Sequence, residues 1–105
     1  MRLKIINIAT DFSDLPYGRM RGDGPASAQV FREDILAPAL KTHDKVTVVL
    51  DGVFGYASSF LEEAFGGLKR QGFTEFQLMH KLEIVSNDDK HLLKEVADYI
   101  KDKGN

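Results

Sequence analysis

The stretch Val46–Leu68, VTVVLDGVFGYASSFLEEAFGGL, decides the fold. It begins with a run of β-branched residues, Val46–Leu50, which is typical of a buried strand. An Asp-Gly pair ends this run, and an amphipathic helical pattern begins after the serine pair, Ser58 and Ser59. The stretch therefore predicts a central strand, a loop and a helix whose first turn carries two hydroxyl groups.

Three further segments carry strand patterns. Leu3–Ala9 is rich in isoleucine and is expected to be partly buried on both faces, and Leu82–Val85 is a short apolar run. A short additional strand is expected around Tyr17–Met20, within a segment rich in turn-forming residues. Together with Val46–Leu50, these segments predict a mixed sheet of about four strands.

Two long helices are expected on either side of the central strand. The first runs from about Pro25 toward Leu40, and Pro38 is expected to kink it or end it near Leu36. The second follows the serine pair and is expected to end at Gly72. Two glycines at positions 66–67 cost this helix about 1 kcal/mol each relative to alanine, so close packing of the backbone is expected there.

Two shorter helices complete the pattern. Thr74 and Gln77 have the spacing of a capping box and predict a short helix over Glu75–His80. Asn87 is expected to be the N-cap of the last helix, and Gly104 is expected to end it. Strands that alternate with helices indicate an α/β fold with parallel strand pairs.

The composition limits the classes of protein to consider. The 105 residues include 14 basic and 16 acidic side chains, for a net charge of -2, and no cysteine. We expect a single domain, residues 1–105, and neither nucleic acid nor a membrane surface as a partner, because no excess of positive charge attracts phosphate groups. Disulfides and cysteine metal sites are excluded. No apolar run approaches the roughly 20 residues of a membrane span, so we expect a cytoplasmic protein.

The glycine-rich segment before the first long helix is a candidate anion site. Arg19 and Arg21 supply guanidinium groups, and Gly22 and Gly24 supply flexible backbone next to the helix start near Pro25. The spacing matches neither a Walker A loop nor a GxGxxG motif. A nucleotide or small-ligand site and a plain connecting loop remain the two alternatives.

The run Gly55–Gly67, together with a Gly-rich turn, Phe31-Arg32 and Pro38, resembles a bacterial family of STAS-like domains of unknown function. More distantly, the order of strand, acidic residue, loop, serine pair and helix resembles the STAS domains of anti-sigma-factor antagonists. The resemblance implies a STAS-like fold and a non-enzymatic regulatory module. It also implies a protein partner, such as a kinase-like protein or an ATPase regulator.

The serine pair has two interpretations. In the antagonists the first serine of the pair is phosphorylated by a partner kinase, so the resemblance implies a phosphosite at Ser58 or Ser59, although Ala57 replaces the usual aspartate. A phosphate there adds about 1.5 to 2 negative charges and meets the free N–H groups of a helix start. The alternative is that Ser58 or Ser59 only caps the helix, a role worth about 1 kcal/mol.

The expected docking surface combines the loop with the second long helix. Glu62 and Glu63 are adjacent in a helix, where side chains point about 100° apart, so we expect a solvated helix face rather than an acid–base pair. We predict no catalytic residue, no metal site and no cofactor; a small enzyme with a dispersed site is the last alternative. The residues expected to contact the partner are Phe54, Gly55, Tyr56, Phe60, Glu62 and Glu63.

Overall fold

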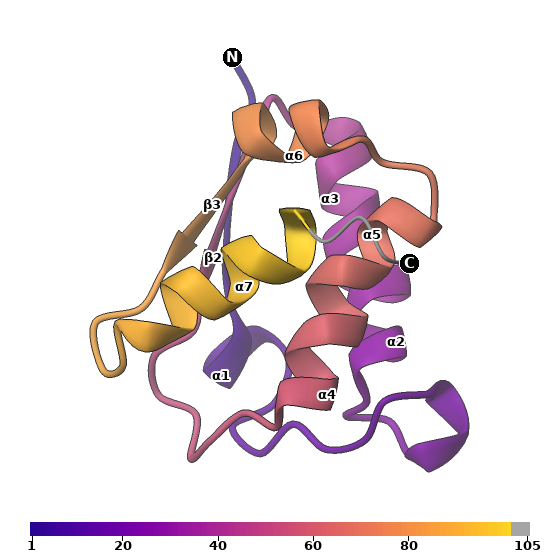
Figure 1. Cartoon of the computed structure of the whole chain (residues 1–105), viewed down its shortest axis with the longest axis vertical. Coiled ribbons are helices and arrows are strands. Elements are labelled where there is room, and N and C mark those ends of the chain that lie inside the picture. Colours follow the sequence, from indigo (N-terminus) through magenta and orange to yellow (C-terminus); the bar gives the residue numbers. More distant parts are fainter. Residues whose placement is uncertain (102–105) are drawn as a thin grey trace.

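The fold is built on a sheet of three parallel strands. The computed structural model describes residues 1–101, and the predicted stop at Gly104 lies outside the described residues. The strands are β1 (Leu3–Asn7), β2 (Lys45–Val49) and β3 (Leu82–Val85), in the order β1-β2-β3. β2 is central, as its sequence predicts, and the helices lie against one face of the sheet (Figure 1).

Helices connect and follow the strands. Two of them are long and contain a π-helical stretch: the first long helix (residues 28–42) joins α2, η2 and α3, and the serine helix (residues 58–70) joins α4, η3 and α5. The bounds are α1 Ile8–Asp11, the 3-10 helix η1 Arg21–Asp23, α2 Ala28–Val30, η2 Phe31–Leu36, α3 Ala37–Thr42, α4 Ser58–Leu61, η3 Glu62–Gly66, α5 Gly67–Arg70, α6 Glu75–Lys81 and α7 His91–Lys101.

The predicted fourth strand is wrong. Within residues 1–101 the sheet has three strands, all parallel, rather than about four in a mixed sheet. The segment at Tyr17–Met20 pairs with the start of the first long helix instead. The Tyr17 N–H donates to the carbonyl of Ala26, and the Gly18 carbonyl accepts from the N–H of Ala28, both at 3.0 Å. These bonds take up backbone groups that a further strand needs.

Within the described residues 1–101, the helices cover one face of the sheet (Figure 1). Ile6 lies on the helix side and is buried, and its partner in the register, Val48, is fully buried. Leu3 and Ile5 point the other way and are 64% and 68% exposed. The expectation that the first strand is partly buried on both faces is therefore wrong, because the two long helices and α7 pack on the same side of the sheet (Figure 1).

The first long helix starts later and continues further than predicted. It begins at Ala28, where the Ser27 side chain accepts a hydrogen bond from the Val30 N–H. It does not end near Leu36 but runs to Thr42. A π-helical turn directly precedes Pro38, and the i→i+5 bonding of such a turn accommodates a residue that has no N–H to donate.

The last helix also begins later than predicted. Asn87 is not its N-cap, because α7 starts at His91. The Asp51 carboxylate, at the end of β2, accepts hydrogen bonds from the main-chain N–H groups of Asn87 and Asp88 at 2.7 and 2.8 Å. These bonds hold the segment after β3 as a turn directed toward β2.

Other local predictions are confirmed. Thr74 and Gln77 form the predicted capping box at the start of α6. Gly72 follows the serine helix with φ of 116°, a conformation that favours glycine. The expected close packing at the glycine pair is also confirmed: a Cβ on Gly67 would overlap the Arg32 side chain, and one on Gly66 would lie 3.5 Å from a main-chain oxygen of α7.

Gly67→Ala therefore tests the packing between the two long helices. We expect a destabilisation of about 1–3 kcal/mol, because the added methyl group overlaps Arg32, whose guanidinium is held by other bonds and does not move aside freely. Urea unfolding of the purified protein measures this change. Gly22→Ala is the matched control, since nothing lies within 4 Å of its Cβ. Equal unfolding midpoints for the two variants contradict the packing described here.

Candidate functional site

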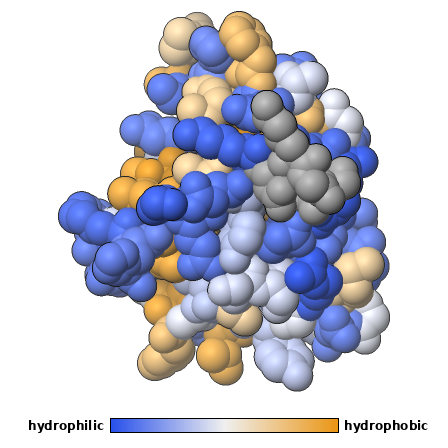
Figure 2. Space-filling model, viewed as in Figure 1, coloured by the Kyte–Doolittle hydropathy of each residue, from blue (hydrophilic) through white to orange (hydrophobic). Residues whose placement is uncertain are grey.

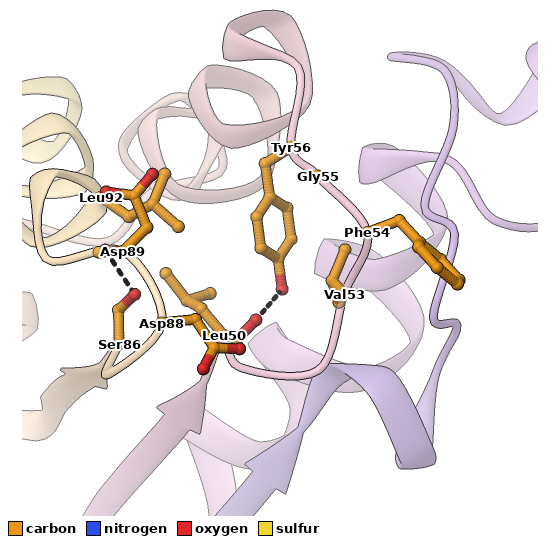
Figure 3. A pocket seen from close by; sticks show the side chains of 9 residues that line it. All are labelled: Leu50, Val53, Phe54, Gly55, Tyr56, Ser86, Asp88, Asp89 and Leu92. Carbon is orange, nitrogen blue, oxygen red and sulfur yellow. Dashed lines mark hydrogen bonds between the residues drawn. The ribbon is translucent and has the colours of Figure 1, made fainter.

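The candidate site lies at the carboxyl end of the sheet, where partners and ligands of open parallel sheets usually bind. Two loops meet there: the β2 loop (residues 50–57) leads to the serine helix, and the β3 loop (residues 86–90) leads to α7. A pocket of about 390 Å³ separates them (Figure 3). Its lining consists of Leu50, Val53, Phe54, Gly55, Tyr56, Ser86, Asp88, Asp89 and Leu92.

Hydrogen bonds fix the two loops. The Tyr56 hydroxyl donates to the carbonyl of Leu50 at 2.8 Å, which closes the β2 loop on itself (Figure 3). The Gly52 N–H donates to the Asp88 carboxylate at 3.1 Å and joins the two loops. The pKa of Asp51 is lowered, chiefly because the Asp88 main-chain N–H donates to its carboxylate. The loops therefore have defined conformations.

The tip of the β2 loop is apolar and exposed. Phe54 is 85% exposed, and its main-chain N–H donates to the carbonyl of Asp14 at 3.2 Å. This bond brings the loop beside the segment before the first long helix, where Leu15 and Tyr17 are also largely exposed. Figure 2 shows apolar residues at the lower left of the molecule, over the loop that follows β2. Three large apolar side chains thus face solvent at this end.

Ser58 and Ser59 are the first two residues of α4, and both are exposed. The N-cap is Ala57, which has no side chain that can cap, so the interpretation of either serine as the cap is wrong. The Ser58 side chain lies close to the Tyr99 hydroxyl of α7, which donates to Glu95 at 2.8 Å. The bond to Glu95 is the main reason that the pKa of Tyr99 is raised.

Two residues expected on the docking surface are buried. Phe60 is 1% exposed and packs against Tyr56, with 6.0 Å between ring centroids. Glu63 is 7% exposed and pairs with Arg32, which donates from Nη1 to the Glu63 carboxylate and main-chain oxygen, both at 2.6 Å. Phe60 and Glu63 are therefore interior residues that hold the serine helix in place. The expectation of a solvated face is wrong for Glu63.

Glu62 is the other carboxylate of this pair, and it is also neutralised within the chain. Arg70 donates to it at 2.7 Å, and so does Arg19, whose Nη1 also lies 3.1 Å from Glu63. The pKa of Glu62 is lowered, chiefly by the bond from Arg70. Burial raises the pKa of Glu63, but the bonds from Arg32 and Arg19 outweigh it and the pKa is lowered. A lowered pKa does not suit a general acid near neutral pH.

The structure separates the two arginines of the predicted anion site. Arg19 points to the serine helix, whereas Arg21 forms ion pairs with Glu33 and Asp34 of the first long helix. Gly22 and Gly24 lie in open surroundings, since a Cβ on either would meet no atom within 4 Å. An anion has to compete with carboxylates for both guanidinium groups. Anion binding at this segment stays a prediction.

Several residues of the site are not among those predicted from the sequence. Asp88, Asp89 and Leu92 reach the pocket because β3 lies beside β2 with the same direction, and this adjacency places the ends of both strands together. Two acidic residues directly after a predicted parallel strand were the available signal. Within residues 1–101 no group of three His, Asp or Glu side chains has a geometry suited to a metal ion.

Comparison with known proteins identifies one family. Residues 27–91, more than half of the chain, match a family model described as a STAS-like domain of unknown function. No curated protein and no solved structure matches the chain. The matched segment includes both long helices, β2, β3 and the two loops of the candidate site. In the part of the chain that the structure describes, no helix has the length and apolar composition needed to cross a membrane.

The ion pairs of Glu62 and Glu63 predict that the free energy of unfolding depends on pH in the acidic range. Their pKa values in the folded state lie below the ordinary value of 4.5, so the stabilisation is complete above that pH and is lost as the pH falls through the folded-state values. We expect the unfolding free energy to decrease below about pH 4.5, measured by urea unfolding from pH 7 to pH 3. The Glu62→Gln/Glu63→Gln variant is expected to lose part of this decrease. An identical pH dependence in wild type and variant contradicts the assignment.

Proposed function

Because the chain belongs to the family of STAS-like domains of unknown function, we propose that it is a non-enzymatic regulatory module that binds another protein. The proposed docking surface is the carboxyl end of the sheet. The proposed partner is a kinase-like protein or an ATPase regulator, as the resemblance to anti-sigma-factor antagonists suggests. The family match supports a regulatory or interaction role. The exposed apolar side chains at the carboxyl end of the sheet support the location of the docking surface.

The observation that carries the proposal is the exposure of Phe54. An aromatic side chain that is 85% exposed leaves a large apolar area in water, and aromatic residues are enriched among the side chains that dominate protein interfaces. Exposed Leu15 and Tyr17 extend the apolar surface. The backbone bond from Phe54 to Asp14 fixes the loop before binding, which reduces the entropy lost on association.

The proposed surface differs in part from the one expected from sequence. Phe54, Gly55 and Tyr56 remain in it, because all three lie in the β2 loop and line the pocket. Phe60 and Glu63 support the surface from inside rather than forming it. The partly exposed Glu62 stays paired with arginines, and we assign it the same supporting role.

Ser58 is proposed as the regulatory position of this surface. Its hydroxyl is exposed, and only three residues separate it from Phe54. A phosphate on Ser58 brings negative charge close to the Tyr99 hydroxyl and to Glu95, which accepts a hydrogen bond from that hydroxyl. The N–H groups at the start of the serine helix partly compensate that charge. The added charge beside an apolar contact is expected to weaken docking.

Measured affinity for a candidate kinase-like partner tests the proposal. Phe54→Ala is expected to weaken binding at least about tenfold, as for the loss of an aromatic anchor. Ser58→Asp is expected to weaken it by about the same factor, because the carboxylate adds charge where the phosphate adds it. Isothermal titration calorimetry of the purified pair gives these values.

Two control variants show whether a loss of affinity comes from the proposed surface or from any comparable substitution. Phe76→Ala removes an aromatic ring of similar exposure, 72%, from α6 at the other end of the molecule. Ser58→Asn changes the shape of the side chain without adding charge. Both are expected to bind as wild type does. If Phe54→Ala binds as tightly as Phe76→Ala, the carboxyl end of the sheet is not the docking surface.

A further inference from the structure

The pocket beside the β2 loop has an apolar floor and one aromatic wall. Tyr56 stands opposite Leu92 and Asp89, with Leu50 below them (Figure 3). The volume of about 390 Å³ lies at the low end of the range for ligand sites, about 300–1,000 Å³. A cavity of this size fits one long side chain or a small molecule, and its apolar residues suit a methylene chain.

The rim of the pocket carries carboxylates that form no ion pair within the described residues. Asp88 and Asp89 are exposed at the rim, and Asp51 lies next to them at the end of β2. Within residues 1–101 none of these three carboxylates forms an ion pair. Lys90, in the same loop, offsets part of the charge at Asp51. A positively charged ligand group is therefore attracted to the rim.

The acidic residues of the two long helices, by contrast, form ion pairs with arginines. Glu62 binds two arginines, Glu63 binds three, and Asp34 binds Arg21. The four carboxylates of the two long helices, Glu33, Asp34, Glu62 and Glu63, thus have arginine partners, whereas within residues 1–101 those at the pocket form no ion pair. Asp89 uses one carboxylate oxygen, Oδ1, to accept from the His91 N–H, so its second oxygen remains available to a ligand.

We propose that this pocket receives a lysine or arginine side chain of the protein partner. The methylene stem lies against Leu50 and Leu92, and the cationic head binds the carboxylates of Asp88 and Asp89. The wall formed by Tyr56 provides an aromatic surface beside the cation. This inference rests on the proposed function, because it identifies the chemistry of the partner at the same surface.

The direction of Phe54 adds a second requirement on the partner. Its ring points away from the pocket, toward the segment before the first long helix (Figure 3). A partner that contacts the ring and also fills the pocket therefore holds the β2 loop from both sides. The partner segment that fits carries a basic residue for the pocket and an apolar residue for Phe54.

Titration of the full-length, ¹⁵N-labelled protein with single capped amino acids tests the pocket directly. The probes are N-acetyl-lysine methylamide and N-acetyl-arginine methylamide, and N-acetyl-norleucine methylamide supplies the apolar stem without the charge. We expect saturable shifts of the Gly55, Ser86 and Leu92 amide signals with the two cationic probes. Norleucine is expected to bind about fivefold more weakly, as for the loss of one exposed ion pair. Equal affinities for lysine and norleucine, or shifts that do not saturate, overturn the inference.

Variants of the rim supply the matched comparison. Asp88→Asn and Asp89→Asn keep an oxygen that accepts the backbone bonds of the loop but remove the charge. Each is expected to weaken the lysine probe about threefold to fivefold. Asp98→Asn removes an exposed carboxylate from another part of α7, where it pairs with Lys94, and is expected to have no effect. Equal lysine affinity in Asp89→Asn and Asp98→Asn contradicts the assignment of the rim.

The same variants distinguish this inference from the proposed function. If Phe54→Ala loses the partner while Asp88→Asn and Asp89→Asn bind it as wild type does, docking at this surface stands and the basic side chain is excluded. If the cationic probes bind the pocket but Phe54→Ala retains the partner, the docking surface is wrong although the pocket is cation-selective. Loss of partner affinity in all three variants supports both the docking surface and the binding of a basic side chain in the pocket.

Discussion

The buried ion pair between Arg32 and Glu63 is the interaction on which the arrangement of the helices depends. Each residue is only 7% exposed, and Arg32 reaches both the carboxylate and the main-chain oxygen of Glu63. Both residues lie in π-helical stretches, and Gly67 leaves room for the Arg32 side chain. A charge buried without its partner is strongly unfavourable, so each residue of the pair holds the other helix in position.

Fixing the two long helices also fixes the surface that we assign to partner binding. The serine helix begins where the β2 loop ends, so the loop has one rigid attachment at β2 and another at the helix. Bonds from Tyr56 to Leu50 and from Phe54 to Asp14 hold it between these points. An exposed aromatic residue on a fixed loop resembles the way binding residues are generally presented on rigid scaffolds. The unpaired carboxylates of the β3 loop add charge selectivity to the same surface.

Local patterns predicted the elements of this fold, and distant contacts account for the errors. Val46–Leu50 and Leu82–Val85 were identifiable because a short apolar run bounded by turn residues is a local signal. The last helix starts later than its local pattern predicts because the Asp51 carboxylate, 36 residues away, accepts a hydrogen bond from the N–H of Asn87. Glu63 was assigned to a solvated face because its partner, Arg32, is 31 residues away, and no helical periodicity reveals such a pairing. The pocket was missed for the same reason, since it forms only where β2 and β3 lie side by side.

A double-mutant cycle between Arg32 and Glu63 tests the central claim most directly. The single variants Arg32→Met and Glu63→Met and the double variant are compared with wild type by urea unfolding at pH 7. Each single change is expected to cost about 3 kcal/mol, because it removes the shortest ion pair of a buried charge. Glu63 then keeps only its longer contacts with Arg19 and Arg70. Arg32 keeps its contacts with Glu33, Gln71 and the main-chain oxygen of residue 63. The double variant is expected to be at least as stable as either single variant, with a coupling energy of about 2 kcal/mol or more. Additive effects, within about 0.5 kcal/mol, would contradict a buried pair that joins the two helices.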